Sequence, residues 1–302
     1  MMMHPPHYQS LIDPATWAFI RATEAAYPPD TASQSIAGQR AVYDAMCRSF
    51  HAGTPPGVTA QDETVAGVPC RRYPGRNPVV IYFHGGGFVV GGLHSHDDVC
   101  AEIRAATGLT VLAVDYRLCP EHPHPAAYDD CLAVARATPG PILLAGDSAG
   151  GALAAAVAAT LRDPRLLGQV LIYPGLGGHG ASHQRHANAP MLTAEDVAFY
   201  ARIRGAAPDD PTANPLAATD FTGLPPTLTL AAECDPLADD AADYAARIIA
   251  AGGRAQTVTE PGLVHGYLRA RHTVPRARAS FARITSTLAA FAQRRWPFGD
   301  MP

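Results

Sequence analysis

The chain has 302 residues, of which 47% are hydrophobic, and this fits one large α/β domain with insertions rather than a small stapled domain. The formal net charge of −4, without a basic stripe or an acidic tail, argues against nucleic acid as a partner. No stretch is apolar for as long as a membrane helix needs, and the N-terminal sequence lacks the pattern of a signal peptide, so we expect a soluble cytoplasmic protein without a membrane partner.

Residues 1–50 predict a helical N-terminal arm. Residues 16–27 and 34–50 have the apolar spacing of helices, and Pro28 and Pro29 separate the two segments. Residues 51–76 are rich in Gly, Pro and Thr, which predicts short strands and turns.

Beyond residue 77, short apolar runs alternate with alanine-rich stretches of helical spacing. The runs predict buried strands at 78–83, 110–115, 141–145, 169–173, 227–232 and 255–259. The stretches predict helices at 96–107, 126–137, 149–162, 237–251 and 274–294. This alternation is typical of an α/β protein with a mostly parallel sheet that helices cover on both faces.

One insertion interrupts the alternation. It lies between the strand that ends near Tyr173 and the strand that starts near Thr227, and it includes a helix expected at 193–204. An insertion of this size in an α/β domain is usually a lid or cap. We expect it to pack with the arm over the carboxyl ends of the strands, where open α/β sheets bind ligands.

Six cysteines are scattered along the chain, without a C-x-x-C pair or the spacing of a zinc site. This distribution favours free, buried thiols in a reducing compartment, and the even number leaves one or two disulfides open as an alternative. The six are Cys47, Cys70, Cys100, Cys119, Cys131 and Cys234.

The segment Gly146-Asp-Ser-Ala-Gly matches the pattern G-x-S-x-G. It follows an expected strand directly and opens an expected helix at Ala149, which is the setting of a nucleophile elbow. In such a turn the hydroxyl of Ser148 is pushed outwards, while Gly146 and Gly150 let the strand and the helix approach closely. We predict Ser148 as a nucleophile; the alternative is a tight turn with an ordinary N-cap serine.

Three consecutive glycines follow the strand at 78–83, in the segment His84-Gly-Gly-Gly-Phe-Val-Val. Such a run is costly in chain entropy, and it is useful where backbone N–H groups must face a ligand. We expect the amides of Gly85 and Gly86, together with that of Ala149, to stabilise an oxyanion. A phosphate-binding loop is disfavoured because neither G-x-G-x-x-G nor a P-loop lysine is present.

The side chains beside these glycines have other expected roles. We expect His84 to brace the loop through hydrogen bonds to nearby backbone rather than to act as the base. Phe88 and Val89 are expected to line the acyl pocket; ordinary packing against the cap is the alternative, and the two interpretations are compatible.

A serine hydroxyl needs a base to remove its proton. His265 lies in a glycine-flanked loop after the last expected strand, and Asp235 lies just after the strand at 227–232. The order Ser, Asp, His is that of an α/β-hydrolase, so we predict His265 as the base and Asp235 as its orienting acid. The competitors for these roles are Glu233, Asp239 and His272.

Together these motifs resemble the bacterial hormone-sensitive-lipase family of α/β-hydrolases, over roughly residues 77–295. The segments that carry the resemblance are His84-Gly-Gly-Gly, Asp115-Tyr-Arg-Leu-Cys-Pro-Glu-His-Pro-His-Pro-Ala, Gly146-Asp-Ser-Ala-Gly, Asp235-Pro-Leu-Ala-Asp and His265-Gly-Tyr. The chain departs from the family pattern at Cys119, His124 and Tyr267.

The resemblance implies an α/β-hydrolase fold and a carboxylesterase for short- to medium-chain acyl esters, with a helical cap and no cofactor. It also implies that Tyr267 lies in the substrate pocket, and it is compatible with a homodimer. The arm is then residues 1–50, the catalytic domain residues 51–174 and 223–302, and the cap insertion residues 175–222.

Two further expectations concern polar side chains. Arg117 and Glu121 are candidates for a charge-assisted pair that fixes their loop, unless both are merely solvated. The cap histidines His179, His183 and His186 have no carboxylate or cysteine nearby in sequence, so we expect no metal site.

Two other classes of function stay open at this point. The triad chemistry of a small-molecule esterase is shared with amidases, peptidases and lactonases, which the sequence does not separate. A ligand-binding protein on the same fold is also an alternative, because fold does not fix function.

Overall fold

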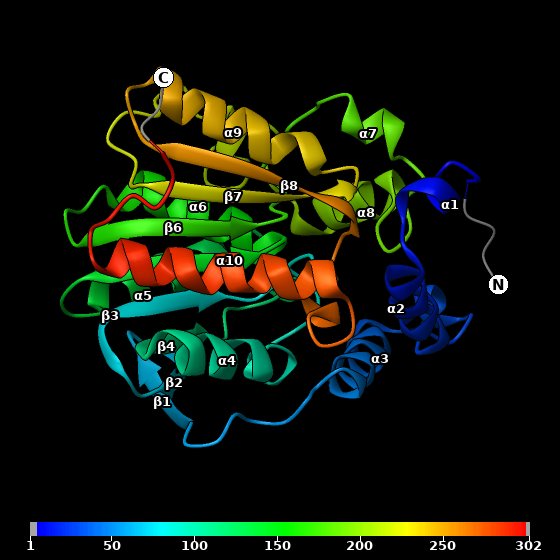
Figure 1. Ribbon diagram of the computed structural model, residues 1–302, viewed down its shortest axis with the longest axis horizontal. Coiled ribbons are helices and arrows are strands. Elements are labelled where there is room, and N and C mark those ends of the chain that lie inside the picture. Colours follow the sequence, from blue (N-terminus) through cyan, green and yellow to red (C-terminus); the bar gives the residue numbers. More distant parts are fainter. Residues whose placement is uncertain (1–4, 300–302) are drawn as a thin grey trace.

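The computed structural model describes residues 5–299, so the first four residues of the predicted arm and the last three of the chain lie outside the described residues (Figure 1). Within that range, eight strands form one sheet in the order β1-β2-β4-β3-β5-β6-β7-β8. The β1–β2 and β2–β4 pairs are antiparallel, and every other neighbouring pair is parallel.

The strands and helices alternate along the chain as the apolar pattern predicts. The strands are β1 (Gln61–Val65), β2 (Val68–Tyr73), β3 (Arg76–Phe83), β4 (Leu109–Val114), β5 (Ile142–Asp147), β6 (Leu166–Ile172), β7 (Thr227–Cys234) and β8 (Ala255–Val264). The α-helices are α1 (Tyr8–Leu11), α2 (Pro14–Ala25), α3 (Ile36–Ser49), α4 (Asp97–Thr107), α5 (Ala126–Ala137), α6 (Ala149–Leu161), α7 (Ser182–Arg185), α8 (Ala194–Arg204), α9 (Ala238–Ala250) and α10 (Pro275–Ala292).

Four short 3-10 helices complete the secondary structure of the described residues. They are η1 (Thr31–Ser33), η2 (Leu93–Ser95), η3 (Pro215–Ala217) and η4 (Tyr267–Ala270). Two of them lie beside the predicted site: η2 follows the glycine loop and η4 follows His265.

Successive side chains of the central strands point to opposite faces of the sheet, and each face has its own core. On one face, Ile81 of β3 and Leu144 of β5 belong to the same cluster as Leu153 of α6. On the other face, Val80 of β3 packs in a second cluster that includes Leu288 of α10. Helices α4 and α10 therefore cover one face and α5, α6 and α9 the other, as predicted (Figure 1).

The end of β8 differs from the sequence prediction. The sequence predicts a strand over 255–259, which stops before Pro261 and Gly262. In the structure β8 continues to Val264, which pairs with Cys234 of β7 across a register shift. The N–H of Gly262 donates to a carboxylate oxygen of Glu233 at 2.6 Å, and this side chain replaces the missing ladder partner.

The arm and the insertion lie at the end of the sheet where the parallel strands terminate. Figure 1 shows α2 and α3 on this side together with α8. Helix α8 begins at the predicted position, where the hydroxyl of Thr193 accepts a hydrogen bond from the amide of Asp196 in a capping box. The boundaries of arm, catalytic domain and cap stay predictions.

Two of the expectations from composition can be compared with the structure. All six cysteines lie within the described residues, and each is buried and free, as predicted. Among residues 5–299, no helix combines the length and the apolar content that crossing a bilayer demands.

Candidate active site

Two hydrogen bonds connect the three residues predicted as a triad, with His265 in the middle. The hydroxyl of Ser148 donates to Nε2 of His265 at 2.8 Å. The Nδ1–H of His265 donates to Oδ2 of Asp235 at 2.6 Å, because a carboxylate can only accept. This bond fixes the tautomer, and it leaves the lone pair of Nε2 aimed at the serine.

The candidate acid, Asp235, is deeply buried, whereas the candidate base, His265, is partly exposed. The side chain of Asp235 is 0% exposed, while that of His265 is 12% exposed. The second carboxylate oxygen of Asp235 accepts the amide of Leu237 at 2.9 Å, so both oxygens are held. Asp235 follows β7 and His265 follows β8, and the pairing of these strands brings the two residues together.

The backbone turns sharply at Ser148, which joins β5 to α6. Its φ of 53° and ψ of −118° lie outside the regions that most L-residues adopt, and its amide donates to Ile172 at the end of β6 at 2.8 Å. A Cβ on Gly146 would collide with the backbone of Gly150, and one on Gly150 with the carbonyl oxygen of Phe83. The glycines of the motif are therefore required by close backbone approach, as predicted.

The amide of Gly85 has a different partner from the one expected. It donates to Oδ1 of Asp147 at 2.9 Å, and Asp147 lies directly before Ser148. In this arrangement that amide is not available to an oxyanion, which corrects the prediction for Gly85. The physical reason is a buried carboxylate, invisible in the local pattern, that needs donors.

The other amides of the predicted oxyanion hole are free. Within residues 5–299, no hydrogen-bond acceptor is found for the amides of Gly86, Gly87 or Ala149. Gly86 has a φ of 131° and Gly87 one of 59°, conformations that favour glycine. Ala149 also opens α6, so its amide lies at the positive end of a helix dipole. The amides of Gly86 and Ala149 are therefore available to an oxyanion, as expected, and so is the amide of Gly87.

His84 braces the loop, as predicted. Its Nδ1 lies 2.8 Å from the carbonyl oxygen of Gly85, and its ring stacks on that of Tyr116 with centroids 4.2 Å apart. The hydroxyl of Tyr116 donates to the backbone carbonyl of His84 at 2.6 Å. Burial, with a smaller effect from His96, lowers the pKa of His84 to about 3, so this imidazole is neutral.

The three residues predicted to line the substrate pocket are buried in the described structure. Phe88 is 8% exposed and Val89 1% exposed, and the guanidinium carbon of Arg204 in α8 lies 3.8 Å from the ring centroid of Phe88. Tyr267 is fully buried, and its hydroxyl contacts that of Ser280 in α10 at 2.8 Å. Phe88 therefore packs against the insertion, and a place of Phe88, Val89 and Tyr267 in the substrate pocket stays a prediction.

A side chain of the insertion, which the sequence did not single out, lies at the glycine loop. The partly exposed ring of Tyr200 in α8 lies where a Cβ on Gly87 would be. The spacing of α8 gives no indication of this contact, because the contact depends on how the insertion folds back over the loop.

The competing residues have other partners. Oε2 of Glu233 accepts the amide of Gly262 at 2.6 Å, and Oδ2 of Asp239 accepts the amide of Ser182 at 2.8 Å. Nε2 of His272 lies 2.9 Å from a carboxylate oxygen of Glu102. None of these three side chains contacts Ser148 or His265 among the described residues.

The expected pair of Arg117 and Glu121 does not form. Arg117 instead binds the carboxylate of Asp130 in α5, with its closest contact at 2.8 Å. Glu121 binds Arg40 of α3 at 2.7 Å. The carboxylate of Asp130 is far less exposed than that of Glu121, so the guanidinium of Arg117 binds the less hydrated acid.

The cap histidines do not converge on one point: the ring centroids of His179 and His183 lie 6.3 Å apart, whereas His186 contacts the arm. Nδ1 of His186 accepts from or donates to the hydroxyl of Tyr8 at 3.0 Å, and Nε2 of His183 lies 3.6 Å from Oδ1 of Asp240. In the part of the chain that the structure describes, no group of three or more His, Cys, Asp or Glu side chains is arranged to hold a metal ion.

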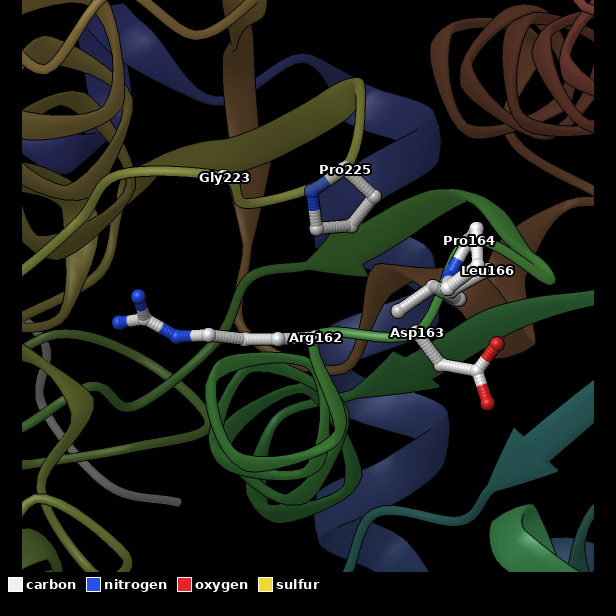
Figure 2. Close-up of a pocket in the computed structure, with 6 residues that line it drawn as sticks. All are labelled: Arg162, Asp163, Pro164, Leu166, Gly223 and Pro225. Atoms are coloured by element: carbon white, nitrogen blue, oxygen red, sulfur yellow. The ribbon is translucent and has the colours of Figure 1, made fainter.

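A pocket of about 300 Å³ lies at the opposite end of the sheet, where β6 and β7 begin (Figure 2). Its charged groups are already paired, Arg162 with Asp220 at 2.7 Å and Asp163 with Arg165 at 2.8 Å. We therefore assign it no role in the reaction. The residues around it are Arg162, Asp163, Pro164, Leu166, Gly223 and Pro225.

Comparisons with known proteins identify the family of this chain. Residues 80–269 match the family described by the α/β hydrolase fold. The carboxylesterase NlhH of Mycobacterium tuberculosis is 39% identical over 227 residues, which cover 68% of this chain and 71% of that protein.

Two solved structures extend the likeness to nearly the whole chain. The hyperthermophilic esterase from the archaeon Pyrobaculum calidifontis has a TM-score of 0.85 at 31% identity, and the match covers 93% of this chain and 99% of that one. An esterase from the bacterial hormone-sensitive lipase family has a TM-score of 0.84 at 30% identity, with the same coverage. The chain therefore belongs to the α/β-hydrolase family, among the carboxylic ester hydrolases of the bacterial hormone-sensitive-lipase type.

Proposed function

We propose that the protein hydrolyses short- to medium-chain acyl esters of small molecules through a Ser148–His265–Asp235 triad and an acyl-enzyme intermediate. The observation that carries the proposal is the pair of hydrogen bonds that connects the three side chains, 2.8 Å from Ser148 to His265 and 2.6 Å from His265 to Asp235. A hydroxyl, an imidazole and a buried carboxylate in this order form the arrangement needed for nucleophilic acyl transfer.

The first half of the reaction acylates Ser148. Nε2 of His265 takes the hydroxyl proton while the serine oxygen attacks the ester carbonyl carbon, and the C=O electron pair moves onto the carbonyl oxygen. When that pair returns, the bond to the alcohol oxygen breaks. The leaving alkoxide takes the proton from His265, and the acyl group stays on Ser148.

The second half of the reaction uses water in place of the serine. His265 removes a proton from the water, the hydroxide attacks the acyl carbon, and a second tetrahedral intermediate forms. Its collapse releases the carboxylic acid, and the proton on His265 returns to the oxygen of Ser148. Asp235 stays ionised throughout and stabilises the imidazolium.

The free amides beside Ser148 suit the stabilisation of both tetrahedral intermediates. Ala149 and Gly86 supply donors that need no rearrangement, and one such donor is typically worth about 10²- to 10³-fold in kcat. The preference for short to medium chains rests on the motif resemblance and on the packing of Tyr200 of α8 against the glycine loop.

The proposal is tested with p-nitrophenyl esters from acetate to palmitate and with the p-nitroanilides of the same acids. We expect the wild type to cleave the short esters fastest and to cleave the anilides far more slowly. Ser148→Ala should lose at least about 10³-fold in kcat. Ser286→Ala, an exposed serine of α10 that donates to the carbonyl of Arg283, is the matched control and should keep full activity.

Two outcomes would contradict the proposal. Turnover that survives in Ser148→Ala would exclude this serine as the nucleophile. A folded wild type that cleaves no ester would exclude the reaction itself, and anilide cleavage alone would favour an amidase.

A further inference from the structure

Arg269 of η4 lies four residues after His265 and binds two neutral groups of other segments. Its Nη1 donates to the carbonyl oxygen of Ser95 in η2 at 3.0 Å, and its Nη2 donates to the hydroxyl of Tyr43 in α3 at 2.8 Å. Its guanidinium carbon lies 5.3 Å from the ring centroid of Tyr43. One side chain thus joins the segment after the predicted base, the segment after the glycine loop and the arm.

No carboxylate within the described residues lies at ion-pair distance from this guanidinium. Arg271, two residues further along and also buried, is by contrast paired: it binds Asp98 at 2.6 Å and Glu102 at 2.7 Å. Holding a cation among neutral acceptors costs desolvation free energy, so the position requires some compensation. The carboxylate of Asp147, which lies beyond direct contact, supplies part of this compensation.

A series of hydrogen bonds runs from Arg269 to the glycine loop. Ser95, whose carbonyl binds Arg269, has its hydroxyl oxygen 2.8 Å from Nδ1 of His96. Nε2 of His96 lies 3.3 Å from Oδ2 of Asp147 and therefore donates to it. Oδ1 of Asp147 accepts the amide of Gly85 at 2.9 Å, so the series ends on the backbone that precedes Gly86.

Asp147 is the anion on which this series depends. Burial opposes its ionisation, but the charge of His96, hydrogen bonds from His96 and Tyr82, and the charge of Arg269 together hold its pKa below the ordinary value. An ionised carboxylate can accept from Gly85, Tyr82 and His96 at once, whereas a protonated one would have to donate one bond.

The tight fit of the loop makes its orientation sensitive to these bonds. A Cβ on Gly85 would collide with the carboxylate of Asp147, and one on Gly86 with the carbonyl of Val90. A small rotation of the Gly85 peptide would therefore move the next amide, that of Gly86, away from the oxyanion. Loss of such a donor acts on the transition state and leaves ground-state binding of the substrate largely unchanged.

We propose that Arg269 is a positioning residue for ester hydrolysis, which orients the glycine loop through Ser95, His96 and Asp147 and holds it in register with the loop of His265. The inference rests on the proposed function, because it assigns the loop to the oxyanion of the Ser148 adduct. Arg269 itself touches neither Ser148 nor His265 among the described residues.

The test compares Arg269→Met, Arg269→Lys and the control Arg278→Met with the wild type, using p-nitrophenyl butyrate as substrate. Arg278 is exposed, and its side chain donates to the carbonyl of His272. A trifluoromethyl ketone, which Ser148 converts into a hemiketal oxyanion, reports on the oxyanion hole, and the corresponding methyl ketone reports on ground-state binding.

We expect Arg269→Met to lower kcat by about 10- to 100-fold with KM within about twofold, because one oxyanion donor becomes misaligned. The inhibition constant of the trifluoromethyl ketone should rise by the same factor, and methyl ketone binding should not change. Arg269→Lys keeps the charge and one donor, so it should recover part of the loss, and Arg278→Met should match the wild type.

Equal kcat values for Arg269→Met and Arg278→Met would overturn the proposal, and so would a fall in kcat without weaker trifluoromethyl ketone binding. If Arg269→Met does not fold, Arg269→Lys decides: about 3- to 10-fold losses in both measurements support the proposal, and wild-type values overturn it. Turnover that survives in Ser148→Ala would contradict both the proposed function and this inference. An inactive Ser148→Ala together with an Arg269→Met variant of wild-type activity would contradict only the inference.

Discussion

Ser148 illustrates how a single residue is held in an unfavourable conformation. Its positive φ costs on the order of 1–3 kcal/mol, and such strain persists only where the surroundings determine it. Here the amide of Ser148 is tied to Ile172, and its hydroxyl is tied to His265. The strained conformation places the hydroxyl of Ser148 at the end of the sheet, beside the loop that holds His265.

Asp235→Asn tests the orienting role of the buried acid. An asparagine whose oxygen keeps the bond from Leu237 presents its amide NH₂ to His265, which favours the wrong imidazole tautomer. We expect kcat to fall by about 10³- to 10⁴-fold while the protein still folds. Ester turnover and the circular dichroism spectrum are the measurements, and a loss below tenfold would exclude Asp235 as the orienting acid.

His84 should make the folded state less stable in acid. Its folded pKa of about 3 lies below the ordinary value for histidine, so below about pH 6.5 the unfolded chain binds a proton that the folded protein refuses. The contribution of His84 to the free energy of unfolding is complete above that pH. It declines as the pH falls towards 3, and at pH 5 it is lower by about 2 kcal/mol.

Urea unfolding of the wild type and of His84→Asn at pH 7 and pH 5 measures this effect. The free energy of unfolding should fall more for the wild type between the two pH values than for the variant. The difference between the two proteins isolates His84 from other histidines, including His183, whose pKa the nearby carboxylate of Asp240 raises and which therefore has the opposite pH dependence. Equal pH dependence in the two proteins would contradict a neutral, buried His84.

At the scale of elements, the contact between β3, β5 and α6 determines where the nucleophile sits. Gly150 lies in the first turn of α6, and its Cα faces the carbonyl oxygen of Phe83 at the end of β3. Gly151 packs against Pro174, beyond the end of β6. The first turn of α6 is thus enclosed by the ends of two strands, and only glycine permits this proximity.

Gly150→Ala should therefore disturb both the fold and the reaction. The new methyl group would displace backbone rather than a flexible side chain, at a cost of about 1–3 kcal/mol. Displacement of α6 would also move Ala149 and Ser148, so kcat should fall at least about tenfold. Thermal unfolding and ester turnover measure the two effects.

Gly38→Ala is the matched control for this substitution. Gly38 also lies in the first turn of a helix, α3, but its Cβ would meet only the side chain of Gln34 and the hydroxyl of Ser35. Alanine is the better helix former by up to about 1 kcal/mol, so this variant should be as stable as the wild type or more stable. Equal effects of the two substitutions would exclude close backbone approach as the reason for Gly150.

At the scale of the whole molecule, arginines connect segments that are distant in the chain. Arg40 of α3 donates from Nε to the carbonyl of Val89 at 2.8 Å and joins the arm to the glycine loop. Arg204 of α8 lies over Phe88 and joins the insertion to the same loop. Arg271 joins the segment after His265 to α4. The site is assembled from parts that these contacts hold in register.

Arg271→Met should destabilise the protein without a direct effect on chemistry. Arg271 is 2% exposed, and its loss would leave Asp98 buried without its cation. An uncompensated buried charge typically costs about 3–5 kcal/mol. The double variant Arg271→Met/Asp98→Asn should recover part of this loss, because the remaining group is neutral. Urea unfolding of the three proteins measures the recovery, and identical values for the single and double variants would contradict this explanation.

The sequence by itself determined the order of strands and helices and the identity of Ser148, Asp235 and His265 as candidates. β-branched runs predict strands, and a strand–glycine–helix pattern predicts the turn of a nucleophile. Both patterns are local in the sequence, so they can be recognised without knowledge of tertiary contacts. Even so, the end of β8 was placed too early, because the carboxylate that replaces its ladder partner belongs to Glu233 on another strand.

Only the tertiary structure decided which polar groups meet. The sequence pairs Arg117 with nearby Glu121, whereas the fold supplies the less exposed Asp130. It assigns the amide of Gly85 to an oxyanion, whereas the fold ties this amide to Asp147. The physical reason is that hydrogen bonds and desolvation depend on distances between elements, and those distances exist only once the sheet, the arm and the insertion have packed together.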